Sequence, residues 1–171
     1  MSEREQQDFE TRLAEHRGIL YKLANAYCPA GEDRDDLVQE ILLQLWRSFP
    51  SYDRERRFST WMYRVALNTA ISFARSARAR ATRTVALDES PEAERVAAAA
   101  PNLEDARVTE LYRVLHGLPE LDRALVLLYL EEKSYQEIGE ILGISETNVG
   151  TKLGRLKQAI RRELTTSNKE T

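Results

Sequence analysis

The sequence contains few of the residues on which disulfide, metal and nucleotide chemistry depends. Its 171 residues include one cysteine, Cys28, and two histidines, His16 and His116. A single cysteine excludes an intramolecular disulfide, and the two histidines lack the HExxH spacing of a zinc site. The seven glycines form neither a GxGxxG nor a GxxxxGKS/T pattern, so no nucleotide-binding loop is visible. We therefore expect no catalytic activity, no metal site and no cofactor.

Long apolar runs are also absent. The longest wholly apolar stretch runs from Ala124 to Leu130, which is far too short to cross a bilayer. The chain does not open with the charged and apolar segments of a secretory signal. These absences predict a soluble, cytoplasmic protein that does not insert into a membrane.

Charge is nearly balanced over the whole chain but not along it. The sequence has 25 Lys and Arg against 28 Asp and Glu, a net charge of −3. Residues 64–83 carry five arginines and no acid, and residues 145–163 carry five bases and two acids, whereas residues 1–45 carry ten acids and five bases. Two separate basic segments in an acidic protein indicate selective contact with a polyanion.

Helix-forming residues dominate the chain and predict an all-α fold of two small helical modules. Apolar residues at three- and four-residue steps predict an N-terminal module of three helices within residues 8–80: one over 9–27, one over 33–49 and one that starts near Phe58. Residues 81–103 lack a continuous apolar period and predict a flexible linker. A C-terminal module follows over residues 104–164, with helices expected at 119–132, 135–142 and 145–164.

The C-terminal module has the pattern of a helix-turn-helix, SYQEIGEILGISETNVGTKLGRLKQAI. Gly139 provides a small residue where the helices cross, Gly143 occupies the turn, and Ser145 is a suitable N-cap for the second helix. In such a motif the second helix lies in the major groove of duplex DNA. The alternative is an ordinary helical hairpin with a glycine turn. The side chains offered to DNA would be Glu146, Thr147, Asn148, Thr151, Lys152 and Arg155.

The segment FSTWMYRVALNTA combines aromatic residues with arginines. On a helical wheel Arg64, Asn68, Arg75 and Arg78 share one face, and Trp61 lies at its border. Aromatic rings stack on unpaired bases while guanidinium groups hold phosphates, so this face suits single-stranded nucleic acid. The alternative is that the tryptophan belongs to the core and the arginines are only solvated.

The segment DRDDLVQEILLQLWRSF predicts a helix with one apolar residue on its polar side. Most of its apolar residues, including Trp46, are expected to point inward, whereas Leu43 falls among polar and charged positions. A leucine with a charged rim is typical of a small protein-docking patch, although single exposed leucines are also common.

Taken together, DDLVQEILLQLW, FSTWMYRVALNTAI and LPELDRALVLLYLEEKSYQEIGEILGIS resemble the bacterial RNA polymerase sigma factors of the extracytoplasmic-function (ECF) type, within the sigma-70 family. The resemblance covers residues 8–80, as sigma region 2, and 104–164, as sigma region 4. It implies a transcription initiation factor that binds core RNA polymerase, directs it to promoters and helps to melt the minus-ten element.

The resemblance also implies roles for particular residues. The helix over 33–49 would dock on the clamp helices of the largest polymerase subunit, the polymerase flap would be a further contact, and region 4 would bind promoter DNA. The loop 51–57 would complete the minus-ten site. The polymerase-binding residues would be Asp35, Asp36, Gln39, Glu40, Leu43 and Arg47. The minus-ten residues would be Phe58, Trp61, Tyr63, Arg64, Asn68, Arg75 and Arg78, and the six helix-turn-helix residues named above would read the minus-thirty-five element.

The linker and the recognition helix qualify this interpretation. About 20 linker residues extend at most to roughly 65–70 Å, enough for promoter elements about 70 Å apart. Family recognition helices usually have basic or bulky residues where this chain has Gly150 and Gly154.

Many family members are held inactive by an anti-sigma factor, and the sequence leaves open whether this chain has one. The alternative function is a stand-alone helix-turn-helix regulator with an N-terminal dimerisation or sensing module.

Overall fold

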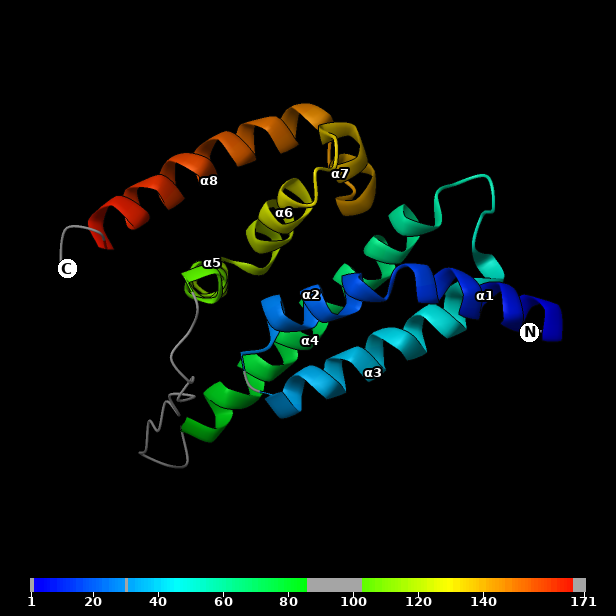
Figure 1. The fold of residues 1–171 in the computed structure, drawn as a ribbon. Helices are drawn as coiled ribbons and strands as arrows, with labels where there is room; N and C mark the ends of the chain where they lie inside the picture. Colours follow the sequence, from blue (N-terminus) through cyan, green and yellow to red (C-terminus); the bar gives the residue numbers. More distant parts are fainter. Residues whose placement is uncertain (1, 30, 86–102, 168–171) are drawn as a thin grey trace.

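The computed structural model describes residues 2–29, 31–85 and 103–167, and these residues contain eight α-helices and no β-strand. The first four helices form the N-terminal module and the last four the C-terminal module, which confirms the expected all-α class (Figure 1). The elements are α1 (Glu3–Glu15), α2 (Arg17–Tyr27), α3 (Gly31–Ser48), the 3-10 turn η1 (Phe49–Ser51), α4 (Phe58–Val85), α5 (Leu103–Gly117), α6 (Glu120–Leu130), α7 (Tyr135–Leu142) and α8 (Glu146–Ser167).

The single helix expected over residues 9–27 is two helices that meet at His16. The backbone N–H of His16 donates to the carbonyl of Leu13, 3.1 Å away, which closes a tight last turn of α1. This bend allows Phe9 of α1 to pack edge-on against Phe49, with ring centroids 5.1 Å apart, while α2 buries Leu23 in the core. The 3.6-residue period continued through the bend, which is why the sequence did not reveal it.

The core of the N-terminal module lies where α2, α3 and α4 pack together. α3 contributes Leu37, Ile41 and Leu45, and α4 contributes Met62 and Leu67, all with almost no exposed surface. At the end of α3, aromatic rings contact one another at centroid distances between 5.0 and 6.4 Å; they belong to Phe49, Tyr52, Phe58 and Trp61. This aromatic cluster fixes the angle between the two helices that carry the predicted docking and minus-ten residues.

The C-terminal module contains a helix-turn-helix formed by α7 and α8. Ser134 and Glu137 form a reciprocal capping box at the start of α7, and Gly143 ends that helix with φ of +70°. A Cβ on Gly139 would lie 2.7 Å from the carbonyl oxygen of Ile144, so the close approach of the turn requires glycine there. The Ser145 hydroxyl accepts a hydrogen bond from the Asn148 backbone N–H at 3.2 Å, which confirms the predicted N-cap.

The expected linker 81–103 is only partly outside the helices. α4 continues through residues 81–85, and α5 begins at Leu103, so both ends of that range are helical. Residues 86–102 lie outside the described residues.

The two modules pack against each other. α4 contacts α6 and α7, and α2 contacts α5, so that the C-terminal helices lie along the side of the N-terminal module formed by α2 and α4 (Figure 1). Buried residues of both modules join in one apolar core. No helix among the described residues is both long and apolar enough to cross a membrane.

Candidate functional site

The outer face of α3 carries the predicted docking residues. Asp35, Asp36, Gln39 and Arg47 are exposed, and Glu40 is half-buried and accepts a hydrogen bond from the Gln44 amide at 2.8 Å. In the same face Leu43 keeps 41% of its surface exposed, as its position on the wheel predicted. The face therefore offers one apolar side chain within a rim of charged and polar groups.

Trp46 belongs to this face as well, although its place in the sequence pattern predicted that it would point inward. Its ring keeps 38% of its surface exposed and rests one edge against Phe9, with centroids 5.5 Å apart. Residues three apart are neighbours on a helix, so Leu43 and Trp46 form a continuous apolar strip beside Arg47. The wheel contained this signal, because Trp46 lies at the edge of the apolar half, next to Leu43.

α4 separates the predicted minus-ten residues into buried and exposed groups. Phe58 and Tyr63 are buried, and Trp61 is half-buried within the aromatic cluster. Their rings hold the start of α4 in place rather than offer themselves to a nucleic acid. By contrast, the shared face predicted from the wheel is exposed: it contains Arg64, Asn68, Arg75 and Arg78.

Tyr63 is covered by the C-terminal module. Its hydroxyl donates to the Glu131 carboxylate at 3.2 Å, and the ammonium of Lys133 lies 5.5 Å from its ring centroid. Burial, together with the neighbouring Glu131, raises the pKa of the Tyr63 phenol. In this docked arrangement, in which the two modules pack against each other, Tyr63 is inaccessible to a nucleic acid strand.

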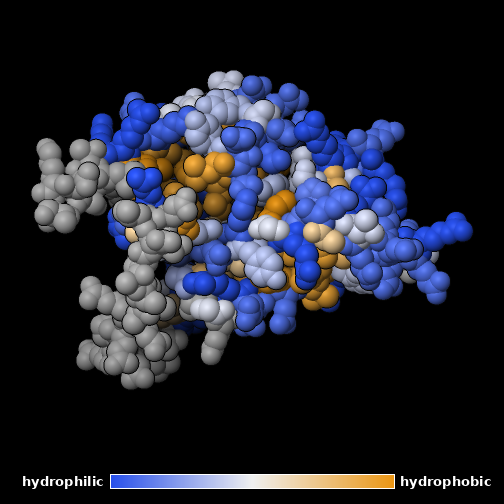
Figure 2. Space-filling model, viewed as in Figure 1, coloured by the Kyte–Doolittle hydropathy of each residue, from blue (hydrophilic) through white to orange (hydrophobic). Residues whose placement is uncertain are grey.

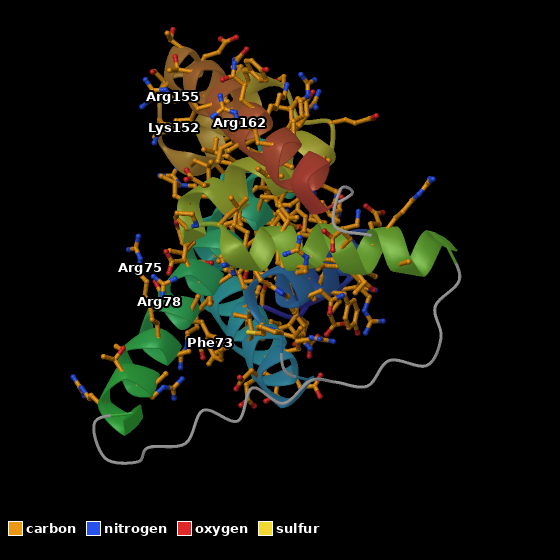
Figure 3. The ribbon with its side chains drawn as sticks, turned by 90° about the vertical axis from the view of Figure 1, so that its left-hand side faces the viewer. Phe73, Arg75, Arg78, Lys152, Arg155 and Arg162 are labelled. Atoms are coloured by element: carbon orange, nitrogen blue, oxygen red, sulfur yellow. The ribbon has the colours of Figure 1, made fainter. Side chains whose placement is uncertain are left out.

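Asn68 lines a hollow of about 440 Å³ between α3 and α4. Glu40 and Gln44 of α3 face Asn68 and Phe73 of α4 across it. Figure 3 shows Phe73 on the side of α4 toward α3, with Arg75 and Arg78 on the outer side. The loop residues Arg56 and Arg57, which were expected to complete a pocket with Asn68, instead line a separate hollow with α7; its other lining residues are Thr60, Ser134, Gln136, Glu137 and Glu140.

The start of α8 presents the predicted duplex-reading residues to the outside. Glu146, Thr147, Asn148, Thr151 and Arg155 are exposed and Lys152 is half-buried. Figure 3 shows Lys152 and Arg155 of α8 on the same side of the molecule as Arg75 and Arg78 of α4. The docked modules thus place basic side chains from two distant segments on one side.

The fold does not require glycine at either unusual position of α8. A Cβ on Gly150 would lie at an ordinary contact distance of 3.5 Å from the Tyr135 ring, and a Cβ on Gly154 would have nothing within 4 Å. Their small size leaves room next to the α8 backbone on a face that already exposes Thr147 and Thr151.

An apolar groove between α5 and α8 is a feature that the sequence pattern did not indicate. It has a volume of about 410 Å³, and Leu111, Val114, Val126 and Ile160 provide most of its apolar lining. Figure 2 shows hydrophobic residues exposed at this side, next to hydrophilic ones. The apolar period of α5 was visible in the sequence, but a period does not show how much of an apolar face the neighbouring helices cover.

Cys28 lies at the end of α2 and is buried. Burial raises the pKa of its thiol to about 11, so at neutral pH it is protonated and a poor nucleophile. Among the residues that the structure describes, no cluster of histidine, cysteine and carboxylate groups could hold a metal ion.

Known families match both modules. Residues 13–80 match the family "Sigma-70 region 2" and residues 109–160 match "Sigma-70, region 4". The chain is 32% identical over 165 residues to the ECF RNA polymerase sigma factor SigE of Mycolicibacterium smegmatis, covering 93% of this chain and 62% of that protein. It is 28% identical to the ECF RNA polymerase sigma-E factor of Escherichia coli K12, covering 91% of this chain and 86% of that protein.

Two solved structures share the fold. One is the sigma factor RpoE in complex with the anti-sigma factor NepR from Bartonella quintana, with a TM-score of 0.73, 20% identity, and coverage of 93% of this chain and 98% of that chain. The other is CnrH in complex with the cytosolic domain of CnrY, with a TM-score of 0.68, 21% identity, and coverage of 94% and 90%.

Proposed function

The chain belongs to the sigma-70 family of RNA polymerase sigma factors, of the ECF type, and on this basis we propose that it binds core RNA polymerase, directs it to specific promoters and helps to melt the minus-ten element. The observation that carries the proposal is the presence of regions 2 and 4, in that order, on helices whose exposed faces suit protein docking and DNA contact. Sigma factors are non-catalytic initiation factors, so the polymerase performs the chemistry. Since such a factor acts on chromosomal promoters, we expect the chain in the cytoplasm.

Each of the two regions makes its own contacts with polymerase or DNA. Residues 8–80 act as region 2, with the outer face of α3 on the polymerase clamp helices and the exposed face of α4 on the minus-ten strand. Residues 104–164 act as region 4, with α8 in the major groove of the minus-thirty-five element. The apolar strip of Leu43 and Trp46 supports the first contact, because an apolar centre inside a charged rim is typical of protein interfaces.

The minus-ten contact on α4 rests on exposed cations and an amide. Arg64 and Arg75 would hold phosphates, and Asn68 beside its hollow would contact an unpaired base. Phe58 and Trp61 position this face from within the aromatic cluster. Two neighbouring structures contain anti-sigma factors or partner domains, which supports an anti-sigma protein as a further class of partner.

Co-elution of the purified chain with bacterial core RNA polymerase tests the proposal. We expect the wild type to co-elute, and the Asp35→Lys/Asp36→Lys variant and Leu43→Asp to lose binding by tenfold or more, since both residues of the pair and Leu43 are exposed and their loss should not unfold the protein. A matched control, Glu10→Lys/Glu15→Lys, makes the same charge change on the exposed side of α1 and should bind normally.

The outcomes separate the alternatives. A wild type that binds duplex DNA alone but not polymerase would favour a stand-alone regulator. Equal binding by the wild type and by both α3 variants would retain the polymerase as partner and move the interface away from α3.

A further inference from the structure

The first helix of the chain contacts the loop that precedes α4. Figure 1 shows α1 beside the end of α3, where η1 and the loop 51–57 begin. Phe9 anchors α1 at this place, because its buried ring packs against the rings of Phe49 and Trp46, with centroids 5.1 and 5.5 Å away. Asp8 and Phe9 precede residues 13–80, which match "Sigma-70 region 2", so that match assigns no role to either residue.

The Asp8 carboxylate joins α1 to the loop through two arginines. Its Oδ1 atom lies 2.8 Å from Nε of Arg12, and its Oδ2 atom lies 2.7 Å from Nη1 of Arg54. Both contacts are charge-assisted hydrogen bonds. The hydrogen bond from Arg12, with a smaller effect from Arg54, lowers the pKa of Asp8, so this carboxylate is ionised at neutral pH. One side chain of α1 thus holds a guanidinium of the loop, 46 residues further along the chain.

The two ends of the loop are fixed by the same network. The Arg12 guanidinium lies 5.9 Å from the ring centroid of Tyr52 and 6.0 Å from that of Phe58, at distances typical of cation–π contacts. The Tyr52 hydroxyl donates to the Arg56 carbonyl at 2.5 Å, which closes the loop on itself. Asp8 is therefore the carboxylate that ties a folded loop to α1.

The three arginines of the loop differ in their surroundings. Arg54 keeps 56% of its side chain exposed and lies 2.7 Å from Asp8. Arg56 and Arg57 keep 67% and 80% exposed, and their carboxylate partners lie 3.7 and 3.3 Å away. Because phosphates are attracted to the cations that are most exposed and least neutralised, Arg56 and Arg57 are better placed than Arg54 to contact a nucleic acid strand. Arg54 is instead placed to support the loop.

We propose that Asp8 is a positioning residue for promoter opening: through Arg54 it holds the loop 51–57 in the conformation in which the loop meets the unpaired minus-ten strand. Arg54 supports the loop and does not bind the strand. The inference rests on the proposed function for what the loop contacts, but the hold of Asp8 on the loop is independent of that function.

Trypsin measures the hold of Asp8 on the loop in the free chain. Trypsin cleaves after arginine, and the loop contains Arg54, Arg56 and Arg57. When the loop opens and closes faster than it is cut, the rate of cleavage reports the open fraction. Brief digestion of the native chain followed by mass spectrometry gives the rate of cleavage after Arg56 and Arg57, two sites that every variant below retains.

The variants use charge reversal and its rescue. Asp8→Arg removes the carboxylate and repels Arg54, and the double variant Asp8→Arg/Arg54→Asp restores an ion pair of opposite polarity. The matched control is Glu10→Arg, the same charge change at an exposed position of α1, whose carboxylate accepts a hydrogen bond from Gln6 on its own helix at 3.0 Å. Circular dichroism melting checks that all the proteins are folded. If Asp8→Arg fails to melt cooperatively, Asp8→Asn, which keeps the shape of the side chain, takes its place.

We expect Asp8→Arg to raise the rate of cleavage after Arg56 and Arg57 about threefold or more. The double variant and Glu10→Arg should stay within about twofold of the wild type. The matched readout of function uses the complex of each protein with bacterial core RNA polymerase and a pool of single-stranded DNA with ten random positions. Sequencing the bound DNA gives the enrichment of the preferred bases.

The base preference distinguishes positioning from a merely structural role. We expect Asp8→Arg to bind polymerase as the wild type does, but to enrich the preferred bases about threefold less or weaker still. The double variant should recover both the protection of the loop and the enrichment, because Arg54 does not touch the strand. A merely structural role would lower the melting temperature or polymerase binding and leave the base preference unchanged.

Three results would overturn the inference. Equal cleavage in the wild type and Asp8→Arg would show that Asp8 does not hold the loop. Faster cleavage with an unchanged base preference would show that the held conformation is not the one that meets the strand. A double variant with a protected loop but no recovered enrichment would show that Arg54 itself contacts DNA. Failure of the wild type to bind polymerase, or to enrich any sequence, would overturn the proposed function instead, and the trypsin rates would still decide whether Asp8 holds the loop.

Discussion

Arg123 on α6 donates a hydrogen bond to the backbone carbonyl of Ala26 on α2, 3.0 Å away and 97 residues earlier in the chain. The same guanidinium donates to the carbonyls of His116 and Leu118 at 2.9 Å, and it lies over the Tyr27 ring. Only 6% of its surface is exposed. One side chain therefore closes the ends of two helices, α2 and α5, that belong to different modules.

Removing this guanidinium should destabilise the whole molecule. We expect Arg123→Ala to lower the free energy of unfolding by about 2–3 kcal/mol, because one buried and two partly buried carbonyls lose their donor. Urea denaturation followed by circular dichroism measures the change. Arg107→Ala, at an exposed position on α5, is the control and should stay within about 0.5 kcal/mol of the wild type. Similar values for the two variants would show that the buried hydrogen bonds contribute little.

The two glycines on either side of the helix-turn-helix should respond to alanine in opposite directions. Gly139→Ala should destabilise the protein by about 1–3 kcal/mol, because its Cβ would meet the Ile144 carbonyl at 2.7 Å and force the turn apart. Gly154→Ala should stabilise it by roughly 0.5–1 kcal/mol, since that position in α8 is open. Melting temperatures compare the three proteins. Destabilisation by both alanines would contradict the open surroundings of Gly154.

His116 should make stability depend on pH in the mildly acidic range. Burial lowers the pKa of His116 below its usual value of 6.5, and this effect outweighs the opposing hydrogen bond to the Asn25 carbonyl. The unfolded chain therefore takes up a proton more readily than the folded one, and stability falls as pH drops through 6.5. The loss levels off below the lowered pKa.

Urea denaturation of the wild type and His116→Gln from pH 8 to pH 5 isolates this contribution. Glutamine can donate to the same carbonyl but does not titrate in this range. We expect the wild type to lose stability relative to the variant as the pH falls. Parallel curves for the two proteins would mean that His116 is protonated as easily in the folded state as in the unfolded state.

The basic side chains of α8 should govern the salt dependence of DNA binding. Under the proposed function, the Lys152→Ala/Arg155→Ala variant in complex with polymerase should bind a promoter fragment more weakly than the wild-type complex does. The slope of log K against log salt concentration should decrease by about 1 for each phosphate that the variant no longer neutralises. Filter binding or fluorescence anisotropy at several salt concentrations measures the slope. The control is Arg107→Ala on α5, for which the slope should not change; an unchanged slope in the double variant would place α8 away from phosphates.

The sequence predicted individual helices well where the period and the end signals agreed. The helix over 135–142 and the N-cap Ser145 were confirmed residue by residue, because Ser134, Gly143 and Ser145 mark the ends through local hydrogen bonds and one positive φ. The bend at His16 was missed because an amphipathic period continues through it. Which of the predicted polymerase- and DNA-contacting residues make those contacts stays a prediction.

The aromatic residues of the candidate site show the limit of wheel arguments. A wheel gives the direction in which a side chain leaves its helix, and it correctly placed Leu43 on the exposed side of α3. It cannot give the distance at which the next helix packs. Trp46 therefore emerged at the surface although it was expected inside. Tyr63 became buried only because another module covers it.

The sequence by itself determined the helical class, the two modules and the family, because these depend on periodicity, caps and motifs that are local along the chain. Only the tertiary structure decided how the modules meet, since that depends on pairs such as Lys22 with Glu131 and Arg123 with Ala26, about a hundred residues apart. A charged residue has the same local signature whether it faces water or a distant partner. The docked arrangement, and with it the covering of Tyr63 and the closing of α2, could therefore be seen only in three dimensions.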